Sequence, residues 1–363
     1  MTTTFDIAVF HGDGIGPEIM APTLQLLRQI SEGASTYGLR FTEAPAGAAH
    51  YAKTGEALPQ ASLEVARAAD AILLSAMGLP DVRYADGTEI SPQIDLRKDL
   101  RLFAGVRPVT VLPGQPTPLI LPAGRKIDFV LIRESTEGLF YSQGSGEVTG
   151  DEARETMLIT RAVSEDLFRF AFALARTRKQ SGRGRGRVTC VDKANVFRAF
   201  AFFREIFDEE AARHPDLTAD HAYVDATALW MVQKPWDFDV MVTENMFGDI
   251  LSDLGAGLMG GLGLAPSADI GLENAVFQPC HGSAPDIAGR GVANPLAMIL
   301  SAAMMLEWLG QRHSIAEMQR DGARLHDAVQ DVVAHGGALT RDLGGSAGTD
   351  AAAEAVTSAL LVA

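Results

Sequence analysis

The sequence predicts an α/β protein with two domains. Short apolar stretches alternate with longer amphipathic ones along the chain, which is the pattern of strands followed by helices. The chain has 363 residues, a length that suggests two domains or one large one, and 47% of them are hydrophobic, which is enough for a sizeable core. Charged residues make up 21% of the chain, so extensive disorder is not expected.

The individual elements follow from this alternation. Short, mainly apolar runs predict strands at 5–10, 71–76, 128–133, 187–191 and 240–243. Apolar residues at helical spacing predict helices at 17–30, 164–176, 196–213, 245–258, 294–309 and 315–334. Pro17 stands in the first turn of the first helix, where proline is well tolerated.

Three segments interrupt the alternation. Residues 109–124 are rich in proline and glycine and suit a connector, whereas residues 138–150 are polar and glycine-rich, as in an exposed hairpin or arm. Residues 181–187 alternate glycine with arginine. We interpret them as a solvated turn rather than an RNA-binding tract, because the segment is short, lacks aromatic residues and belongs to an acidic protein.

Composition limits the partners and the location of the protein. The net charge of −15 argues against binding to nucleic acid or to an anionic membrane, and it means that an anionic substrate would need local cations or a metal. Cys190 and Cys280 form no CxxC pattern and predict buried, reduced thiols. The N-terminus lacks the features of a secretory signal, and the most apolar stretch, 296–306, is too short to span a membrane. We therefore expect a cytoplasmic protein.

An aspartate pair in the helix 245–258 indicates a metal site. Asp249 and Asp253 lie one helical turn apart, and two like charges at this spacing destabilise a helix unless a cation bridges them. Paired carboxylates are typical ligands of Mg²⁺. Asp225, at the end of the strand-like segment 221–224, is a candidate third ligand. The alternative is a solvated helix face.

Lys193 and Arg133 stand near the ends of predicted strands, where ligands gather in α/β proteins, and further arginines lie at 97–107. Lys193 follows the strand 187–191, and a nearby dication would lower its pKa enough for it to act as a base, although a lone lysine there is more often a surface residue. Arginine binds carboxylates through two parallel hydrogen bonds, so Arg97, Arg107 and Arg133 could supply the cations that an anionic substrate needs. The alternative is that some arginines in this region, above all Arg101, pair with acidic neighbours.

The loop His11–Glu18 reads HGDGIGPE and connects a strand to a helix. Its spacing is GxGxG rather than the GxGxxG of Rossmann phosphate-binding loops, and no acidic residue follows a second strand at the expected distance. The loop is therefore consistent with a tight strand-to-helix turn and does not predict a Rossmann fold.

Together these motifs resemble those of the isocitrate/isopropylmalate dehydrogenase family of β-decarboxylating dehydrogenases, which also includes tartrate, D-malate and homoisocitrate dehydrogenases. The matching segments follow the family's order and cover nearly the whole chain, at 12–18, 97–107, 133–138, 192–195, 245–253, 281–289 and 340–345. No single segment is decisive, but their order makes the resemblance specific.

The resemblance implies an isopropylmalate dehydrogenase-like two-domain α/β fold that is distinct from the Rossmann type. Residues 1–104 together with 260–363 would form the cofactor-side domain, and residues 105–259 would form a central dimerisation domain with an arm at about 138–155. The protein would be a homodimer with shared active sites, because Lys193 and Asp225 would come from the neighbouring subunit.

The resemblance also implies roles for individual residues. Arg97, Arg107 and Arg133 would bind the carboxylates of the substrate, Lys193 and Asp225 would be catalytic, and Mg²⁺ or Mn²⁺ would be held by Asp225, Asp249 and Asp253. The cofactor would be bound by Asn195, Asn294 and the loop formed by His281, Gly282, Ser283, Ala284, Pro285, Asp286 and Ile287. Asp286-Ile287 resembles the NAD-specific version of this loop, and an acidic side chain would repel the 2′-phosphate of NADP, so we expect NAD.

The chain departs from the family pattern after the third arginine motif. Phe140 stands in the place of the family's tyrosine, the acid that protonates C3 after decarboxylation, and Tyr141 follows it. In a regular backbone the two side chains point in different directions, so Tyr141 would take this role only through a local bulge. Otherwise a water molecule or another residue would donate the proton.

The residues before Arg97 are expected to contact the third substituent of the malate. Ile90 stands where isopropylmalate enzymes carry an acid, Ser91 resembles the serine of isocitrate and homoisocitrate enzymes, and Gln93 replaces a leucine or an asparagine. A polar wall disfavours an isopropyl group, because its hydrogen-bonding groups stay unpaired. We therefore expect a polar or small substituent, as in isocitrate, tartrate or D-malate. Isopropylmalate stays open because Ile90 and Ile94 are apolar.

Two other functions stay open at this point. One is a non-catalytic regulatory paralogue of such a dehydrogenase, which would be expected to have lost metal ligands. The other is a metal-independent 2-hydroxy-acid dehydrogenase, whose activity would survive chelation.

Overall fold

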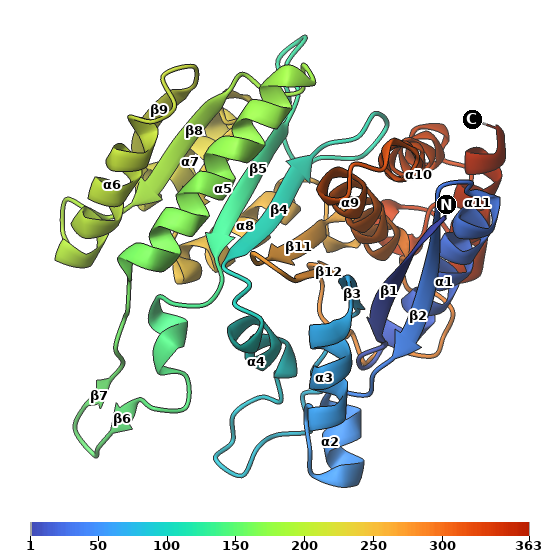
Figure 1. The fold of residues 1–363 in the computed structure, drawn as a ribbon, viewed down its shortest axis with the longest axis horizontal. Helices are drawn as coiled ribbons and strands as arrows, with labels where there is room; N and C mark the ends of the chain where they lie inside the picture. The colour runs from blue at the N-terminus through green and yellow to red at the C-terminus, as the bar shows by residue number, and fades with distance from the viewer. Residues whose placement is uncertain (1, 363) are drawn as a thin grey trace.

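The computed structural model describes residues 2–362 and is built around one ten-stranded mixed sheet (Figure 1). The strand order is β2-β1-β3-β12-β11-β4-β5-β10-β8-β9. The strands span Thr3–Phe10 (β1), Tyr37–Glu43 (β2), Ala71–Leu74 (β3), Ala104–Thr110 (β4), Asp128–Glu134 (β5), Arg187–Asp192 (β8), Thr218–Tyr223 (β9), Val240–Thr243 (β10), Pro266–Ile270 (β11) and Ala275–Pro279 (β12).

The sheet has two parallel halves joined by antiparallel strands. β2, β1, β3 and β12 run parallel to one another, as do β5, β10, β8 and β9. β11 and β4 connect the halves through three antiparallel pairings, so the two halves run in opposite directions. Such a mixed sheet is not the all-parallel sheet of a Rossmann domain, in agreement with the predicted fold class.

Helices cover the sheet on both sides. They span Gly16–Gly33 (α1), Ala48–Thr54 (α2), Gln60–Ala68 (α3), Pro92–Asp99 (α4), Arg161–Gln180 (α5), Arg198–Ala211 (α6), Val224–Gln233 (α7), Asn245–Leu258 (α8), Leu296–Arg312 (α9), Ala316–His335 (α10) and Thr349–Val362 (α11). α9 and α10 pack against each other, and α1 contacts α11, so the beginning and the end of the chain lie in the same half (Figure 1). None of the described helices is long and apolar enough to cross a membrane.

One half of the sheet comes from both ends of the chain and the other half from its middle. The predicted division at 1–104 with 260–363 and at 105–259 stays a prediction. The segment predicted as an arm contains a 3-10 turn, Leu139–Ser142 (η1), and an exposed hairpin of Glu147–Val148 (β6) with Ala153–Arg154 (β7), which projects from the body (Figure 1). The glycine–arginine segment 181–187 is a turn between α5 and β8, as predicted.

The sequence located most of the long helices better than the short elements. β10 and α8 have the predicted bounds, and α5, α6, α9 and α10 differ from prediction mainly at their ends. The short elements β2, α2, α3, α4, β4, α7, β11 and β12 and the longer C-terminal helix α11 were not predicted. Cys190 is buried as expected, whereas Cys280 is only partly buried, and both are free thiols.

Candidate active site

The central strands bring Arg107, Arg133 and a third side chain, Asp269, onto one face of the sheet. Arg133 of β5 stands opposite Gly105 of β4, and Gly105 stands opposite Asp269 of β11. Side chains in one cross-strand row share a face, and Arg107, two residues after Gly105, shares it as well. The row therefore places two arginines and an aspartate together.

Gly105 leaves the space in which these side chains meet. A Cβ atom at Gly105 would lie 2.5 Å from Ser135 Oγ and 3.0 Å from an Asp269 carboxylate oxygen. Any larger residue would push the Asp269 carboxylate out of the row. The glycine is thus required by close approach rather than by backbone conformation.

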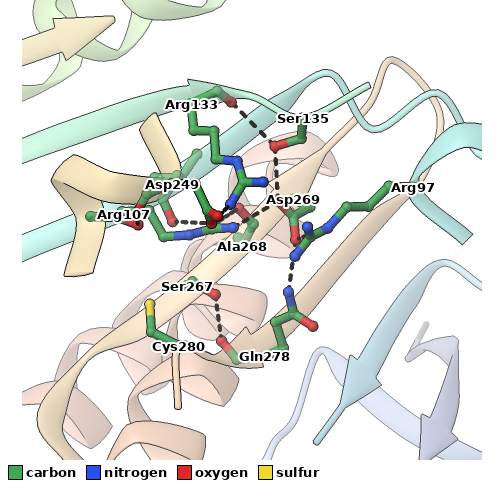
Figure 2. A network of polar contacts seen from close by, with 12 residues as sticks. Arg97, Arg107, Arg133, Ser135, Asp249, Ser267, Ala268, Asp269, Gln278 and Cys280 are labelled. Atoms are coloured by element: carbon green, nitrogen blue, oxygen red, sulfur yellow. Dashed lines mark hydrogen bonds and ion pairs between the residues drawn. The ribbon is translucent and has the colours of Figure 1, made fainter. Parts of the chain in front are cut away.

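Asp269 is the centre of the arginine cluster (Figure 2). Its side chain is fully buried and accepts hydrogen bonds from Arg97 Nε at 3.0 Å and from Arg107 Nη2 at 3.1 Å. Gln278 Nε2 donates to the same carboxylate at 2.9 Å, and Ser135 Oγ donates at 3.3 Å. Burial opposes the charge of Asp269, but Arg107 and Arg97 overcome it and hold the pKa of this carboxyl below its ordinary value.

Arg133 connects this cluster to helix α8. Its Nε donates to Asn245 Oδ1 at 2.8 Å, and its Nη1 donates to the Asp249 carboxylate. The helix can approach so closely because it carries Gly248 at this point, where a Cβ atom would lie 2.6 Å from that of Arg133. Glu244 caps the start of α8 by accepting a hydrogen bond from the Phe247 N–H, which fixes where the helix begins.

The two sheet arginines differ in how well their charge is balanced. Burial disfavours the charge of both, but the pKa of Arg107 stays above its ordinary value because Asp269 is adjacent. Burial and the positive charge of Arg97 lower the pKa of Arg133 to about 10, even though Asp249 contacts it. A further anion is therefore stabilised most strongly beside Arg133.

Asp249 and Asp253 form a carboxylate pair on α8, as predicted from their spacing. Burial and the charge of Asp249 raise the pKa of Asp253, which is the expected effect of an unbridged like-charge pair. Two carboxylates beside solvent fit a hard divalent cation in donor chemistry. Within residues 2–362, no three acidic, histidine or cysteine side chains gather into a metal-binding group, so Asp225 of the same chain does not complete this pair.

Lys193 and Asp225 form a separate ion pair, with Lys193 Nζ 2.7 Å from Asp225 Oδ1. Lys193 follows β8, and Asp225 stands in the first turn of α7 after β9. Both lie at the carboxyl edge that also carries Arg133. β8 lies two strands from β5, which corresponds to about 10 Å at the usual strand spacing. In one chain, the lysine pair and the arginine cluster therefore share an edge without meeting.

The structure distinguishes the two aromatic residues of the departing motif. The Arg133 guanidinium lies over the Phe140 ring, 5.0 Å from its centroid. Tyr141 is about half exposed and lines a surface groove with Thr136, Glu137 and Leu158. Phe140 thus faces the site where the sequence placed it, while the Tyr141 side chain turns toward the groove.

Helix α4 carries the residues predicted to contact the third substituent. Gln93 and Arg97 lie one turn apart, on one face of this helix. Gln93 Oε1 is buried and has no hydrogen-bond donor among the described residues. Ser91 precedes the helix, and its hydroxyl bonds only weakly to Glu89 O at 3.3 Å. Ile90 is fully buried, so its side chain belongs to the protein interior.

The predicted cofactor loop is held by the glycine-rich segment near the N-terminus. Ile15 N donates to Ser283 O at 2.8 Å, and the Glu18 carboxylate accepts hydrogen bonds from Gly289 N and Ala293 N. Burial raises the pKa of Glu18, but the hydrogen bonds that its carboxylate accepts from Thr349 and from these backbone N–H groups keep that pKa below its ordinary value. The segment HGDGIGPE therefore supports this loop, a function that its spacing alone did not reveal.

A cavity beside this loop fits a ligand with hydrogen-bonding groups. It is lined by Ile15, Gly263, His281, Ile287, Arg290, Val292, Asn294, Arg341 and Asp342. His281 Nε2 is buried without a partner among residues 2–362, and burial lowers the pKa of this histidine. Asn294 is buried and donates to Asp342, whereas Asp286, which precedes the lining residue Ile287, is exposed. Asn195 is exposed beyond β8, away from these residues in sequence.

Asp269 was not among the residues singled out from the sequence. A single aspartate in the apolar strand Pro266–Ile270 gives little signal, because its partners Arg97, Arg107 and Gln278 come from three other elements. The alternation of polar and apolar residues in this strand is the one feature that could have drawn attention to it.

Comparisons with known proteins agree with this arrangement. A family model described as isocitrate/isopropylmalate dehydrogenase matches residues 6–360. The 3-isopropylmalate dehydrogenase of Methanothermobacter thermautotrophicus is 41% identical over 344 residues, covering 94% of each chain. The 3-isopropylmalate/3-methylmalate dehydrogenase of Methanocaldococcus jannaschii is 42% identical, covering 96% of this chain and 97% of that protein.

Solved structures show the same fold. The crystal structure of isocitrate dehydrogenase from Methylococcus capsulatus superimposes with a TM-score of 0.85 at 37% identity, covering 98% of this chain and 99% of that one. A β-decarboxylating dehydrogenase from Thermococcus kodakarensis gives a TM-score of 0.78 at 33% identity, with 99% and 96% coverage. The family resemblance and the fold class predicted from the sequence are confirmed.

Proposed function

Because the chain belongs to the isocitrate/isopropylmalate dehydrogenase family and is a decarboxylating dehydrogenase, we propose that it oxidises and decarboxylates a 3-substituted (2R)-malate with NAD and a divalent metal ion. The observation that carries the proposal is the meeting of Arg97, Arg107 and Arg133 beside the Asp249–Asp253 pair. Guanidiniums bind the carboxylates of a hydroxy acid, and paired carboxylates bind a cation.

The arginines orient the substrate. Arg97 and Arg107 are already held by Asp269, and Arg133 is held by Asn245 and Asp249, so little rotamer freedom is lost when an acid binds. Arg133, whose charge is less well balanced than that of Arg107, would attract a carboxylate more strongly than Arg107 does. The chain therefore supplies three prearranged guanidiniums within a protein of net charge −15.

Asp249, Asp253 and the partner subunit's Asp225 would hold Mg²⁺ or Mn²⁺, which when bound supplies Lewis-acid polarisation of the hydroxyl-bearing carbon. Lys193 of the partner subunit would accept the hydroxyl proton at its Nζ. Because Lys193 and Asp225 form an ion pair, the proposed base and the proposed third metal ligand lie side by side. We place Phe140, and not a tyrosine, beside Arg133, so the proton that C3 receives would come from water or from Tyr141 after a rearrangement.

NAD would be bound by Asn195, by Asn294 and by the loop His281–Ile287, and it would supply a hydride acceptor. The unpaired His281 Nε2 and the cavity beside it support this assignment. The exposed Asp286 would accept hydrogen bonds from ribose hydroxyls and repel a 2′-phosphate, so kcat/KM with NAD would exceed that with NADP.

The third substituent of the substrate would be polar or small. The buried and unpaired Gln93 Oε1 favours a substituent that can donate a hydrogen bond, because an alkyl group would leave it unsatisfied. A second candidate is a small alkyl substituent. The names of the relatives favour it, since they include a 3-isopropylmalate dehydrogenase and a 3-isopropylmalate/3-methylmalate dehydrogenase. A homodimer in the cytoplasm, with an arm at about 138–155, completes the proposal.

A screen of NADH production over (2R)-hydroxy diacids and triacids, with and without chelator, tests this function. We expect NADH and CO2 in equal amounts from isocitrate, tartrate or D-malate, and loss of turnover after chelation. Turnover that survives chelation would favour a metal-independent 2-hydroxy-acid dehydrogenase. Turnover of isopropylmalate far above all other acids would overturn the preference for a polar or small substituent.

A further inference from the structure

Asp269 uses both of its carboxylate oxygens inside the substrate-binding cluster. One oxygen accepts hydrogen bonds from Arg107 and Ser135, and the other accepts them from Arg97 and Gln278 (Figure 2). The side chain has no exposed surface. A carboxylate with this number of donors stays ionised, and it is therefore a permanent negative charge between two guanidiniums.

This charge changes what the arginines can offer to a substrate. Arg97 gives its Nε edge to Asp269, and Arg107 gives Nη2 to Asp269 and Nη1 to the carbonyl oxygens of Val106 and Ala268. Within residues 2–362, the two Nη groups of Arg97 have no hydrogen-bond acceptor. A substrate carboxylate can thus approach the outer edge of Arg97, while the inner edges remain occupied by the protein.

The cluster is also neutral in formal charge. Three guanidiniums, those of Arg97, Arg107 and Arg133, face three carboxylates, those of Asp249, Asp253 and Asp269. With a divalent cation held by Asp249 and Asp253, the net charge of the cluster would be about +2, which matches the charge of a dicarboxylate. A third substrate carboxylate would stand in a partly buried region without a cation of its own, and such like-charge contacts are costly.

We propose that Asp269 is the residue that sets substrate charge: by neutralising one guanidinium, it selects hydroxy dicarboxylates and disfavours hydroxy tricarboxylates. The inference rests on the proposed function, since it concerns the acid that binds to the same three arginines. It narrows the substrate class to D-malate and to malates with an uncharged substituent. Asp269 acts through Arg97 and Arg107 and is thus a positioning and specificity residue.

Binding measured without nicotinamide cofactor tests this role separately from turnover. The Kd values of D-malate and isocitrate are measured by calorimetry in a Mg²⁺ buffer for the wild type and for D269N. We expect the wild type to bind D-malate more tightly, and D269N to shift the Kd ratio toward isocitrate by about tenfold or more. If D269N weakens both acids equally, or if the wild type already prefers isocitrate, the proposal is overturned.

Two further variants separate charge from structural support. D239N removes the charge of another buried aspartate, whose Oδ1 lies 2.9 Å from Arg178 Nε outside the site, and it should leave the Kd ratio unchanged. D269N/Q278E moves the negative charge to the adjacent strand and keeps the cluster neutral, so it should fold and should return the ratio toward the wild-type value. A double variant that folds and keeps the D269N ratio, or that binds isocitrate better than the wild type does, would contradict a role of charge. Absence of turnover of every acid by the wild type would refute the proposed function alone, because the binding ratio does not depend on it.

Discussion

Asp269 and Asp225 are both carboxylates that accept a hydrogen bond from a basic side chain, yet Asp269 is fully buried and Asp225 is 68% exposed. Asp269 has four side-chain donors, three from α4, β4 and β12 and one from the residue after β5, whereas the side-chain donor to Asp225 is Lys193. The difference shows that the arginine side of the site is assembled and rigid within a single chain. The lysine side is an ion pair at the surface, between Lys193 and an Asp225 side chain that is open to solvent.

The largest expected effect is on catalysis and concerns the Lys193–Asp225 pair. Lys193→Met should lower kcat by about 10²- to 10⁴-fold, because it removes the proposed general base. The unfolding midpoint should barely change, since an exposed ion pair contributes about 1 kcal/mol or less. Steady-state NADH production and thermal unfolding measure the two effects. Lys234→Met, at a lysine that pairs with Asp237 and stacks on Trp230, is the matched control and should retain wild-type kcat. A clear fall in the unfolding midpoint of Lys193→Met, alongside the loss of kcat, would contradict the contrast between the exposed lysine pair and the buried arginine cluster.

The buried side should respond in the opposite way, with a large loss of stability. Arg107→Met leaves the Asp269 carboxylate buried with one guanidinium fewer, which should cost about 3–5 kcal/mol of unfolding free energy. Arg40→Met removes the exposed pair with Asp6 and should cost about 1 kcal/mol or less. Urea unfolding monitored by circular dichroism compares the two variants. Similar costs would mean that burial does not make the arginine side rigid.

The buried side should also be sensitive to pH. Burial raises the pKa of Glu134, next to Arg133, to about 7, although Thr136 and the Glu137 N–H donate hydrogen bonds to it. A raised carboxyl pKa stabilises the fold fully below the unfolded pKa of 4.5, and this stabilisation is lost as pH rises through about 7. Unfolding free energy should therefore fall between pH 5 and 8 by at most about 3 kcal/mol more in the wild type than in Glu134→Gln. Parallel pH profiles of the two proteins would show that Glu134 titrates normally.

The smallest expected effect concerns the departing motif. Tyr141→Phe should change the rate of NADH and CO2 production by less than about twofold, because the Tyr141 side chain lies in a surface groove and Phe140 faces Arg133. A loss of tenfold or more would identify Tyr141 as the acid and would require the loop to rearrange when substrate binds. Phe140→Leu, which removes the ring from Arg133, is the informative companion and should raise KM more than Tyr141→Phe does.

The sequence predicted the parts of this molecule whose signal is local. Asp249 and Asp253 are one turn apart in a helix with clear periodicity, and Arg133 ends a strongly apolar strand, so each could be placed without knowing the rest of the fold. The role of Asp269 could not be predicted in this way. It depends on the cross-strand row with Gly105 and Arg133 and on a hydrogen bond from Arg97, which lies on a helix far away in the sequence. The role of Glu18 was hidden for the same reason, since its partners Gly289, Ala293 and Thr349 lie near the other end of the chain.

We propose that one chain supplies the arginines and the α8 carboxylates of each site while a second chain supplies Lys193 and Asp225, and subunit complementation tests this sharing most directly. Lys193→Met and Asp253→Asn homodimers should each be inactive. After dissociation and random reassociation in equal amounts, half of the dimers would be hybrids with one intact site, so activity should return to about a quarter of the wild-type value. Native mass spectrometry verifies that hybrids form. A mixture that contains hybrids yet remains as inactive as its parents would contradict a site shared between subunits.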